Sequence, residues 1–165
     1  MDHASAKIFN HCQVSLRAGE TMRGKMLLEL LAHESGFSIK QYHTDNGVFA
    51  SEEFKQHCMN KAQTLKFSGV GAHHQNGVAE RAIGTVTKWA RANLIFLALH
   101  WPEKHNVRLW PMALDYAIWI YNRLPRLDSK LSPDEIWTQL RSSHQDLRCA
   151  HVFGCPVYVL SLIHI

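Results

Sequence analysis

The chain has 165 residues, of which 46% are hydrophobic and 19% are charged, a composition that indicates one globular domain with a core and excludes a disordered chain. Apolar runs stay short of the roughly 18 residues of a membrane-spanning helix, and a secretory signal is not visible, so we expect an intracellular protein without a membrane partner. The formal net charge is +4, with seven Lys or Arg against two acids in residues 81–126. This excess is a mild indication of a polyanionic partner, and an ordinary solvated surface explains it equally well.

The first third of the chain predicts a strand, a helix and a second strand. Residues 6–16 mix β-branched, aromatic and polar side chains, which favours a strand. Residues 20–36 place apolar side chains at helical spacing and end on Gly36, a stop signal. These side chains are Met22, Met26, Leu27, Leu30 and Leu31. Residues 37–42 then predict a strand, and Asp45-Asn46-Gly47 is a strong turn sequence.

The remaining chain predicts mostly helices. Ser51 begins a helix with two acids in its first turn, and residues 63–70 predict a short strand. A long helix follows over residues 78–99, then an aromatic-rich helix over residues 108–125. Ser132 and Pro133 start a further short helix, and residues 151–160 predict a strand or extended segment. The order of elements predicts an α/β fold in which helices flank a mixed sheet.

Two carboxylates fall at positions suited to chemistry. Asp45 follows a predicted central strand, at the sheet edge where ligand-binding side chains gather in open α/β sheets. Glu80 falls in the first turn of the long helix, on a face shared with Lys88 and Arg91 and separate from the apolar face. Each also has a plain structural explanation. Asp45 suits an Asx turn, and Glu80 suits the positive end of the helix dipole.

Taken together, the two acids suggest a metal site. Mg²⁺ binds a few carboxylate oxygens and keeps positions for water and phosphate. Two such ions about 3.5–4 Å apart assist phosphoryl displacement by holding the attacking and leaving oxygens. His43 and Thr44 flank Asp45 and either steady a metal or phosphate or are inert polar residues at a strand end.

A family resemblance is carried by the segments HTDNGVFASEEFKQHC and FSGVGAHHQNGVAERAIGTV. Together they resemble the catalytic core of retroviral and retrotransposon integrases, in particular the Ty1/copia type. The downstream segments LWPMALDYAIWIYNRLP, LSPDEIW and HVFGCPVYVL are similar, in order, to the region after the copia-type core. The resemblance covers about residues 1–160 and implies a ribonuclease-H-like fold.

The resemblance implies that Asp45 and Glu80 are the second and third acids of an Asp–Asp–Glu triad that binds Mg²⁺ or Mn²⁺. The first acid of the family lies on a strand before the one that MDHASAKIF resembles. We therefore expect a first strand to be missing, a chain truncated at both ends, and no catalysis by the chain as given. The expected organisation is a catalytic core over residues 1–100 and a copia-type extension over residues 101–159. We expect residues 160–165 to be a sequencing artefact.

The implied reaction is strand transfer, in which the 3′-hydroxyl of element cDNA attacks a target phosphodiester. The expected partners are double-stranded DNA, meaning element ends and target, and further copies of the chain in a homo-oligomer. Candidate DNA contacts are Lys88, Arg91, His73, His74, Gln75 and Asn76. The family implies a nuclear site of action. Two alternatives stay open, a decayed or domesticated DNA-binding fragment without catalysis and a transposase of the same triad chemistry.

Overall fold

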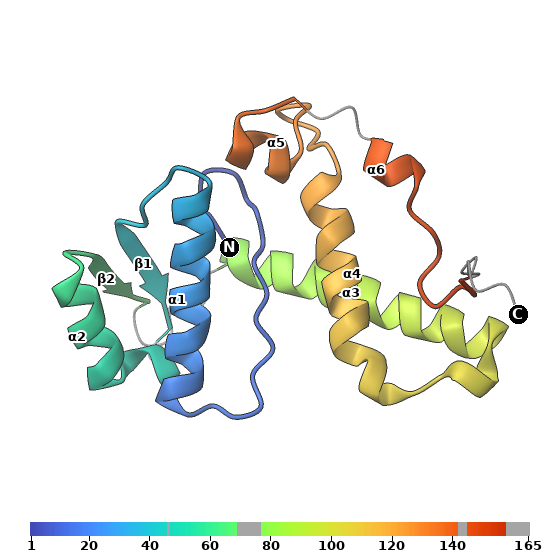
Figure 1. Ribbon diagram of the computed structural model, residues 1–165, viewed down its shortest axis with the longest axis horizontal. Helices are drawn as coiled ribbons and strands as arrows, with labels where there is room; N and C mark the ends of the chain where they lie inside the picture. Colours follow the sequence, from blue (N-terminus) through green and yellow to red (C-terminus); the bar gives the residue numbers. More distant parts are fainter. Residues whose placement is uncertain (46, 69–76, 142–144, 158–165) are drawn as a thin grey trace, which may run out of the picture.

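The structure is a computed structural model that describes residues 1–45, 47–68, 77–141 and 145–157 (Figure 1). Its helices and strands alternate in the first half of the chain, and only helices follow in the second half. In chain order they are α1 (Ala18–Glu34), β1 (Gln41–Thr44), α2 (Glu52–Asn60), β2 (Thr64–Phe67), α3 (Gly77–His100), α4 (Trp110–Arg123), α5 (Pro133–Thr138) and α6 (Gln145–Arg148). The described chain is therefore mixed α/β with more helix than strand, and none of its described helices is long and apolar enough to cross a membrane.

The sheet is smaller than predicted. Within the described residues it consists of β1 and β2 alone, which run parallel with Gln41 opposite Thr64 and Thr44 opposite Phe67. Parallel strands need a crossover connection, and α2 provides it. The prediction of a mixed sheet is therefore wrong for the part of the chain that the structure describes. The residues predicted to extend it at 151–157 contain a turn instead, with Gly154 at a φ of +78°.

The strand predicted over residues 6–16 is also wrong, because a side chain takes the place of a neighbouring strand. The amide of Asn122 on α4 accepts a hydrogen bond from the Ile8 N–H at 2.9 Å and donates one to the Ile8 carbonyl at 2.8 Å. Asn10 Nδ2 likewise donates to Asp115 Oδ1 on α4 at 2.7 Å. The backbone N–H and carbonyl of Ile8 thus find partners on a helix rather than on a neighbouring strand.

Helices α1 to α5 form where local signals predicted them, and α6 was not predicted. Ser51 caps α2 by accepting a hydrogen bond from the Phe54 N–H. Ser132 and Glu135 form a reciprocal capping box at the start of α5, with distances of 3.2 and 2.8 Å. These caps satisfy backbone N–H groups that a helix leaves open in its first turn.

Two hydrophobic clusters lie on either side of the molecule (Figure 1). In the first, Met22 of α1 packs with Phe54 and Cys58 of α2 under Tyr42 of β1. The second lies where α4 crosses α3, and its members are Val86, Ala90, Leu94, Leu97, Ala113, Ala117 and Ile118. Three of these are fully buried alanines, and such small side chains allow the two helix backbones to approach closely.

A buried polar cluster joins α1 to the sheet and α2. The Lys25 ammonium pairs with the Glu29 carboxylate one turn later, and both side chains are largely buried, with exposed fractions of 2% and 9%. Lys25 Nζ also lies 2.9 Å from His57 Nδ1 and 2.8 Å from Gln63 Oε1. Glu29 accepts further bonds from Tyr42 Oη at 3.0 Å and Lys61 Nζ at 2.7 Å.

Hydrogen bonds in this cluster stabilise the charged form of the Glu29 carboxyl against the effect of burial. Burial alone raises the pKa of this carboxyl, but hydrogen bonds led by Lys25 and Lys61 outweigh it and hold the pKa near 2. Burial together with the nearby Glu29 charge raises the pKa of Tyr42. Desolvation, together with the Lys25 charge, lowers the pKa of His57. A buried ion pair of this kind is stable only when further hydrogen bonds satisfy it, as they do here.

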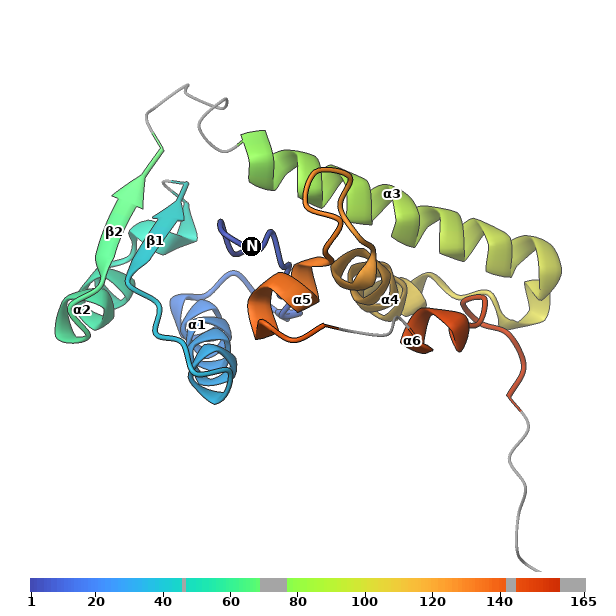
Figure 2. The ribbon, with the colours of Figure 1, turned by 90° about the horizontal axis from the view of Figure 1, so that it is seen from above.

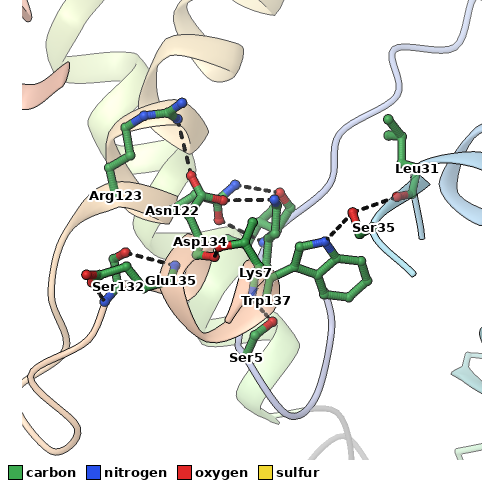
Figure 3. A network of polar contacts seen from close by, with 12 residues as sticks. Ser5, Lys7, Leu31, Ser35, Asn122, Arg123, Ser132, Asp134, Glu135 and Trp137 are labelled. Atoms are coloured by element: carbon green, nitrogen blue, oxygen red, sulfur yellow. Dashed lines mark hydrogen bonds and ion pairs between the residues drawn. The ribbon is translucent and has the colours of Figure 1, made fainter. Parts of the chain in front are cut away.

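Trp137 of α5 connects the two sides of the molecule (Figure 3). Its indole Nε1 donates to Ser35 Oγ, just after α1, at 2.9 Å. Its ring packs against Phe9 and Phe37, each with a centroid distance of 5.1 Å. One buried aromatic side chain therefore contacts the N-terminal segment, the end of α1 and the chain leading into β1.

Candidate functional site

Asp45 comes directly after β1, as the sequence predicted. The Thr44 carbonyl still accepts a sheet hydrogen bond from the Ser68 N–H at 2.9 Å, so the pairing of the two strands persists to this point. The Asp45 side chain is exposed, and its Oδ1 lies 3.4 Å from the Gly47 N–H. This long contact is the Asx turn that the sequence offered as the plain explanation, and it is weak enough to yield to a ligand.

Polar groups gather beside Asp45. Thr44 Oγ1 is buried and has no hydrogen-bond partner among the residues that the structure describes. His43 Nε2 lies 3.3 Å from the Ser68 hydroxyl, across the two strands. A buried hydroxyl without a partner costs roughly 1–3 kcal/mol, so Thr44 marks a place where the fold leaves a polar group unsatisfied next to a carboxylate.

Glu80 lies in the first turn of α3 with its side chain exposed, on the side away from the core. The predicted division of this helix into two faces is largely confirmed. Ala82, Val86, Ala90, Leu94 and Leu97 are buried. Ile83, which the helical period placed on the same apolar face, is exposed, although its neighbour Ala82 is buried.

Lys88 and Arg91 follow Glu80 on the exposed side of α3, two and three turns further on. Neither forms an ion pair within the described residues. Two uncompensated cations on one helix face are available to phosphate groups. The predicted contacts His73, His74, Gln75 and Asn76 lie outside the described residues.

The strand ends and the start of α3 lie on the same side of the molecule. Figure 2 shows the carboxyl ends of β1 and β2 directed toward the side on which the first turn of α3 lies, and Figure 1 shows the same neighbourhood from the front. Both strands run in the same direction, so they end at one edge of the sheet. Asp45 directly follows β1 at this edge, and Glu80 lies in the first turn of α3.

The donor set at this edge fits a hard divalent cation. Carboxylates at a strand end and a helix start supply oxygen ligands and leave positions for water and phosphate, which Mg²⁺ and Mn²⁺ prefer. A group of three or more potential metal ligands does not occur among residues 1–45, 47–68, 77–141 and 145–157.

Comparison with known proteins identifies the fold. No family model matches the chain. Two solved structures of the HTLV-2 integrase catalytic core domain in complex with magnesium are similar to it. The trimeric form has a TM-score of 0.55 and 22% identity, over 76% of this chain and 73% of that chain. The dimeric form has a TM-score of 0.57 and 23% identity, over 81% and 77%.

A third similar structure is the simian T-cell lymphotropic virus intasome in complex with the PP2A regulatory subunit B56 gamma. It gives a TM-score of 0.56 and 18% identity, and the match covers 94% of this chain and 48% of that chain. All three likenesses extend over three quarters or more of this chain. The chain therefore has the fold of a retroviral integrase catalytic core, which implies the ribonuclease-H-like architecture that the sequence predicted.

Proposed function

We propose that the chain contributes two active-site acids, Asp45 and Glu80, to an integrase of the Ty1/copia retrotransposon type, a family whose reaction joins element cDNA to target DNA by metal-dependent strand transfer. The observation that carries the proposal is the likeness of the fold to integrase catalytic cores, and it is supported by Asp45 directly after β1 and Glu80 in the first turn of α3. The triad motifs of the sequence support the retrotransposon type. A nuclear site of action and assembly into a homo-oligomer belong to the same proposal.

In this mechanism the carboxylates of Asp45 and Glu80 would hold Mg²⁺ or Mn²⁺, which when bound would supply Lewis-acid activation of the attacking 3′-hydroxyl and charge stabilisation of the leaving 3′-oxygen. Lys88 and Arg91 bind backbone phosphates and keep the DNA along the exposed face of α3, beside the acids. Phosphate contacts carry no sequence information, so binding along this face is expected to tolerate any DNA sequence.

Metal binding tests the proposal directly. We expect Asp45→Asn and Glu80→Gln each to weaken Mn²⁺ binding by at least about tenfold, because each removes one of few charged ligands. Electron paramagnetic resonance of free Mn²⁺ measures this without any catalytic assay. Glu103→Gln is the matched control, since Glu103 is an exposed acid in the turn after α3. Equal binding by all four proteins would remove the metal site from the proposal.

DNA binding tests the role of the basic residues on α3. We expect Lys88→Gln and Arg91→Gln each to reduce the magnitude of the slope of log K for DNA binding against log salt concentration by about one. The reason is that each phosphate contact releases one condensed counterion. Fluorescence anisotropy with a labelled duplex at several salt concentrations measures the slope. Lys104→Gln, just beyond the opposite end of α3, is expected to leave it unchanged.

The same titration distinguishes the non-catalytic alternative. A fragment that only binds DNA predicts a salt-dependent affinity that is equal with and without Mg²⁺ and unchanged in Glu80→Gln. The alternative has one observation in its favour, the Asx turn that Asp45 makes with Gly47. Metal-dependent binding that is lost in Glu80→Gln excludes it.

A further inference from the structure

His57 accepts a hydrogen bond from a buried ammonium group, and this contact requires a neutral imidazole. Lys25 Nζ lies 2.9 Å from His57 Nδ1, and the Lys25 side chain is only 2% exposed. A charged lysine has three N–H donors and no acceptor. The Lys25 ammonium therefore donates, and His57 Nδ1 presents its lone pair, with the imidazole proton on Nε2.

All three donors of the Lys25 ammonium have acceptors. Besides His57, the ammonium pairs with the Glu29 carboxylate one turn later on α1, and it donates to Gln63 Oε1, just before β2, at 2.8 Å. Loss of any one acceptor would leave a buried N–H of this group without a partner, which is costly in a protein interior. A second proton on the imidazole removes the Nδ1 lone pair and with it one of the three acceptors.

Protonation of His57 would also add a charge of the wrong sign. The charged groups around the imidazole are the Lys25 ammonium on α1, the Lys61 ammonium just after α2, and the Glu29 carboxylate, which pairs with both lysines. The described part of this cluster thus holds two cations and one anion. An imidazolium would be a third cation beside a single carboxylate, and like charges at hydrogen-bond distance repel.

The other titratable groups of the cluster stay neutral. The Tyr42 hydroxyl of β1 donates to the Glu29 carboxylate at 3.0 Å, and burial together with that charge raises the pKa of Tyr42. Burial also raises the pKa of the Cys58 thiol on α2. Desolvation, followed by the Lys25 charge, lowers the pKa of His57. This direction agrees with the neutral imidazole that the hydrogen-bond geometry requires.

We propose that His57 is a pH-sensitive contact, and that its protonation releases the C-terminal end of α2 from α1. Lys25 is buried and keeps its other two acceptors, whereas His57 is only half-buried. The imidazolium rather than the ammonium therefore moves to solvent. His57 lies in the last turn of α2, the helix that connects β1 to β2, so the side of the molecule formed by α1, β1, α2 and β2 opens in mildly acidic solution.

The opening is confined to this side of the molecule, which Figure 1 shows apart from α4 and most of α3. Apart from the polar cluster, α1 and α2 are held by the small apolar cluster of Met22, Phe54 and Cys58. The cluster between α3 and α4 is larger, and its buried members are all aliphatic and do not titrate. The pH-sensitive contact uses neither Asp45 nor Glu80, so it can fail while the proposed function holds.

Hydrogen exchange of backbone amides against pH tests the proposal. Because the pKa of His57 is lower in the folded chain than in the unfolded chain, the open state takes up a proton as it forms. The stabilising contact is fully present above the unfolded pKa of about 6.5 and is lost as the pH falls through the folded pKa. A single proton changes the opening constant by up to about tenfold per pH unit. Between about pH 7 and pH 5 we expect a rise of this size for α2 amides, after correction for intrinsic exchange, and little change for α3 and α4.

His57→Asn is the decisive variant, because the asparagine Oδ1 can take the place of Nδ1 as acceptor and does not titrate. We expect it to abolish the pH dependence of α2 opening. His33→Asn is the matched control, since His33 is an exposed histidine in the last turn of α1, and we expect this variant to keep the full pH dependence. Equal pH dependence in the unmodified chain and in His57→Asn overturns the proposal, as does opening of α3 and α4 together with α2.

A proton NMR titration of the unmodified chain gives a second measurement that needs no variant. The ring resonances of His57 are expected to titrate with a midpoint below the ordinary histidine pKa of about 6.5. The amide resonances of α2 are expected to shift or broaden over the same pH range. A midpoint at or above about 6.5 overturns the proposal, because the folded state would then not disfavour the imidazolium.

Discussion

Lys25→Met is expected to lower the free energy of unfolding by about 3 kcal/mol, because removing one partner of a buried ion pair leaves the other charge uncompensated. The Glu29 carboxylate would keep Lys61 and Tyr42 as partners, which places the loss at the lower end of the usual range. His57 and Gln63 would also lose the bond that each makes with the Lys25 ammonium. Urea denaturation followed by circular dichroism measures the change.

Lys55→Met is the matched control for this substitution. Lys55 also pairs with a glutamate on its own helix, Glu52, at 3.4 Å, but both side chains are exposed. An exposed pair contributes roughly 0–1 kcal/mol, so the control is expected to change stability little. Equal effects of the two substitutions would mean that burial of the Lys25 pair does not determine its contribution.

Trp137→Ala is expected to cost about 3–5 kcal/mol, because it removes a large buried aromatic side chain and leaves a cavity. The cavity would open where the N-terminal segment, the end of α1 and α5 meet. Trp137 joins the two sides of the molecule. Once it is replaced by alanine, we also expect the α1–β1–α2 side to unfold before the α3–α4 pair. Hydrogen exchange of backbone amides on each side, measured by mass spectrometry, tests this order.

Trp137→Phe separates packing from hydrogen bonding at the same position. It keeps an aromatic ring between Phe9 and Phe37 and removes the donor to Ser35. The lost hydrogen bond is expected to cost about 1 kcal/mol, and the smaller ring is expected to add a further loss of packing. If Trp137→Phe were as destabilising as Trp137→Ala, the indole hydrogen bond rather than the packing would hold the two sides together.

The helices and the positions of the two acids were predictable because their signals are local. Ser51 and Ser132 cap helices through backbone groups three residues away. The apolar period of α3 predicts which of its side chains are buried, except at Ile83, which is exposed. Asp45 after a strand and Glu80 in a first turn follow from the same short-range rules.

The fate of residues 6–16 depended on tertiary structure. Their β-branched and aromatic side chains predict a strand whether or not a neighbouring strand is present to pair with it. Asn122, 114 positions away from Ile8, bonds the backbone that a neighbouring strand would otherwise bond. Trp137 packs on Phe9 from α5. Contacts over such sequence separations leave no trace in local pattern, and they override strand propensity.

The sequence by itself determined helices α1 to α5, the turn after β1 and the acid-bearing positions, because short-range backbone hydrogen bonding and helical periodicity decide them. Only the tertiary structure decided that Lys25 is buried while Leu30 is exposed. A lysine is buried when partners from distant segments satisfy its charge, and here His57 and Gln63 come from more than 30 positions away. The inward and outward faces of α1 are therefore set by the partners that the fold assembles around it, and hydrophobicity along the helix alone does not reveal them.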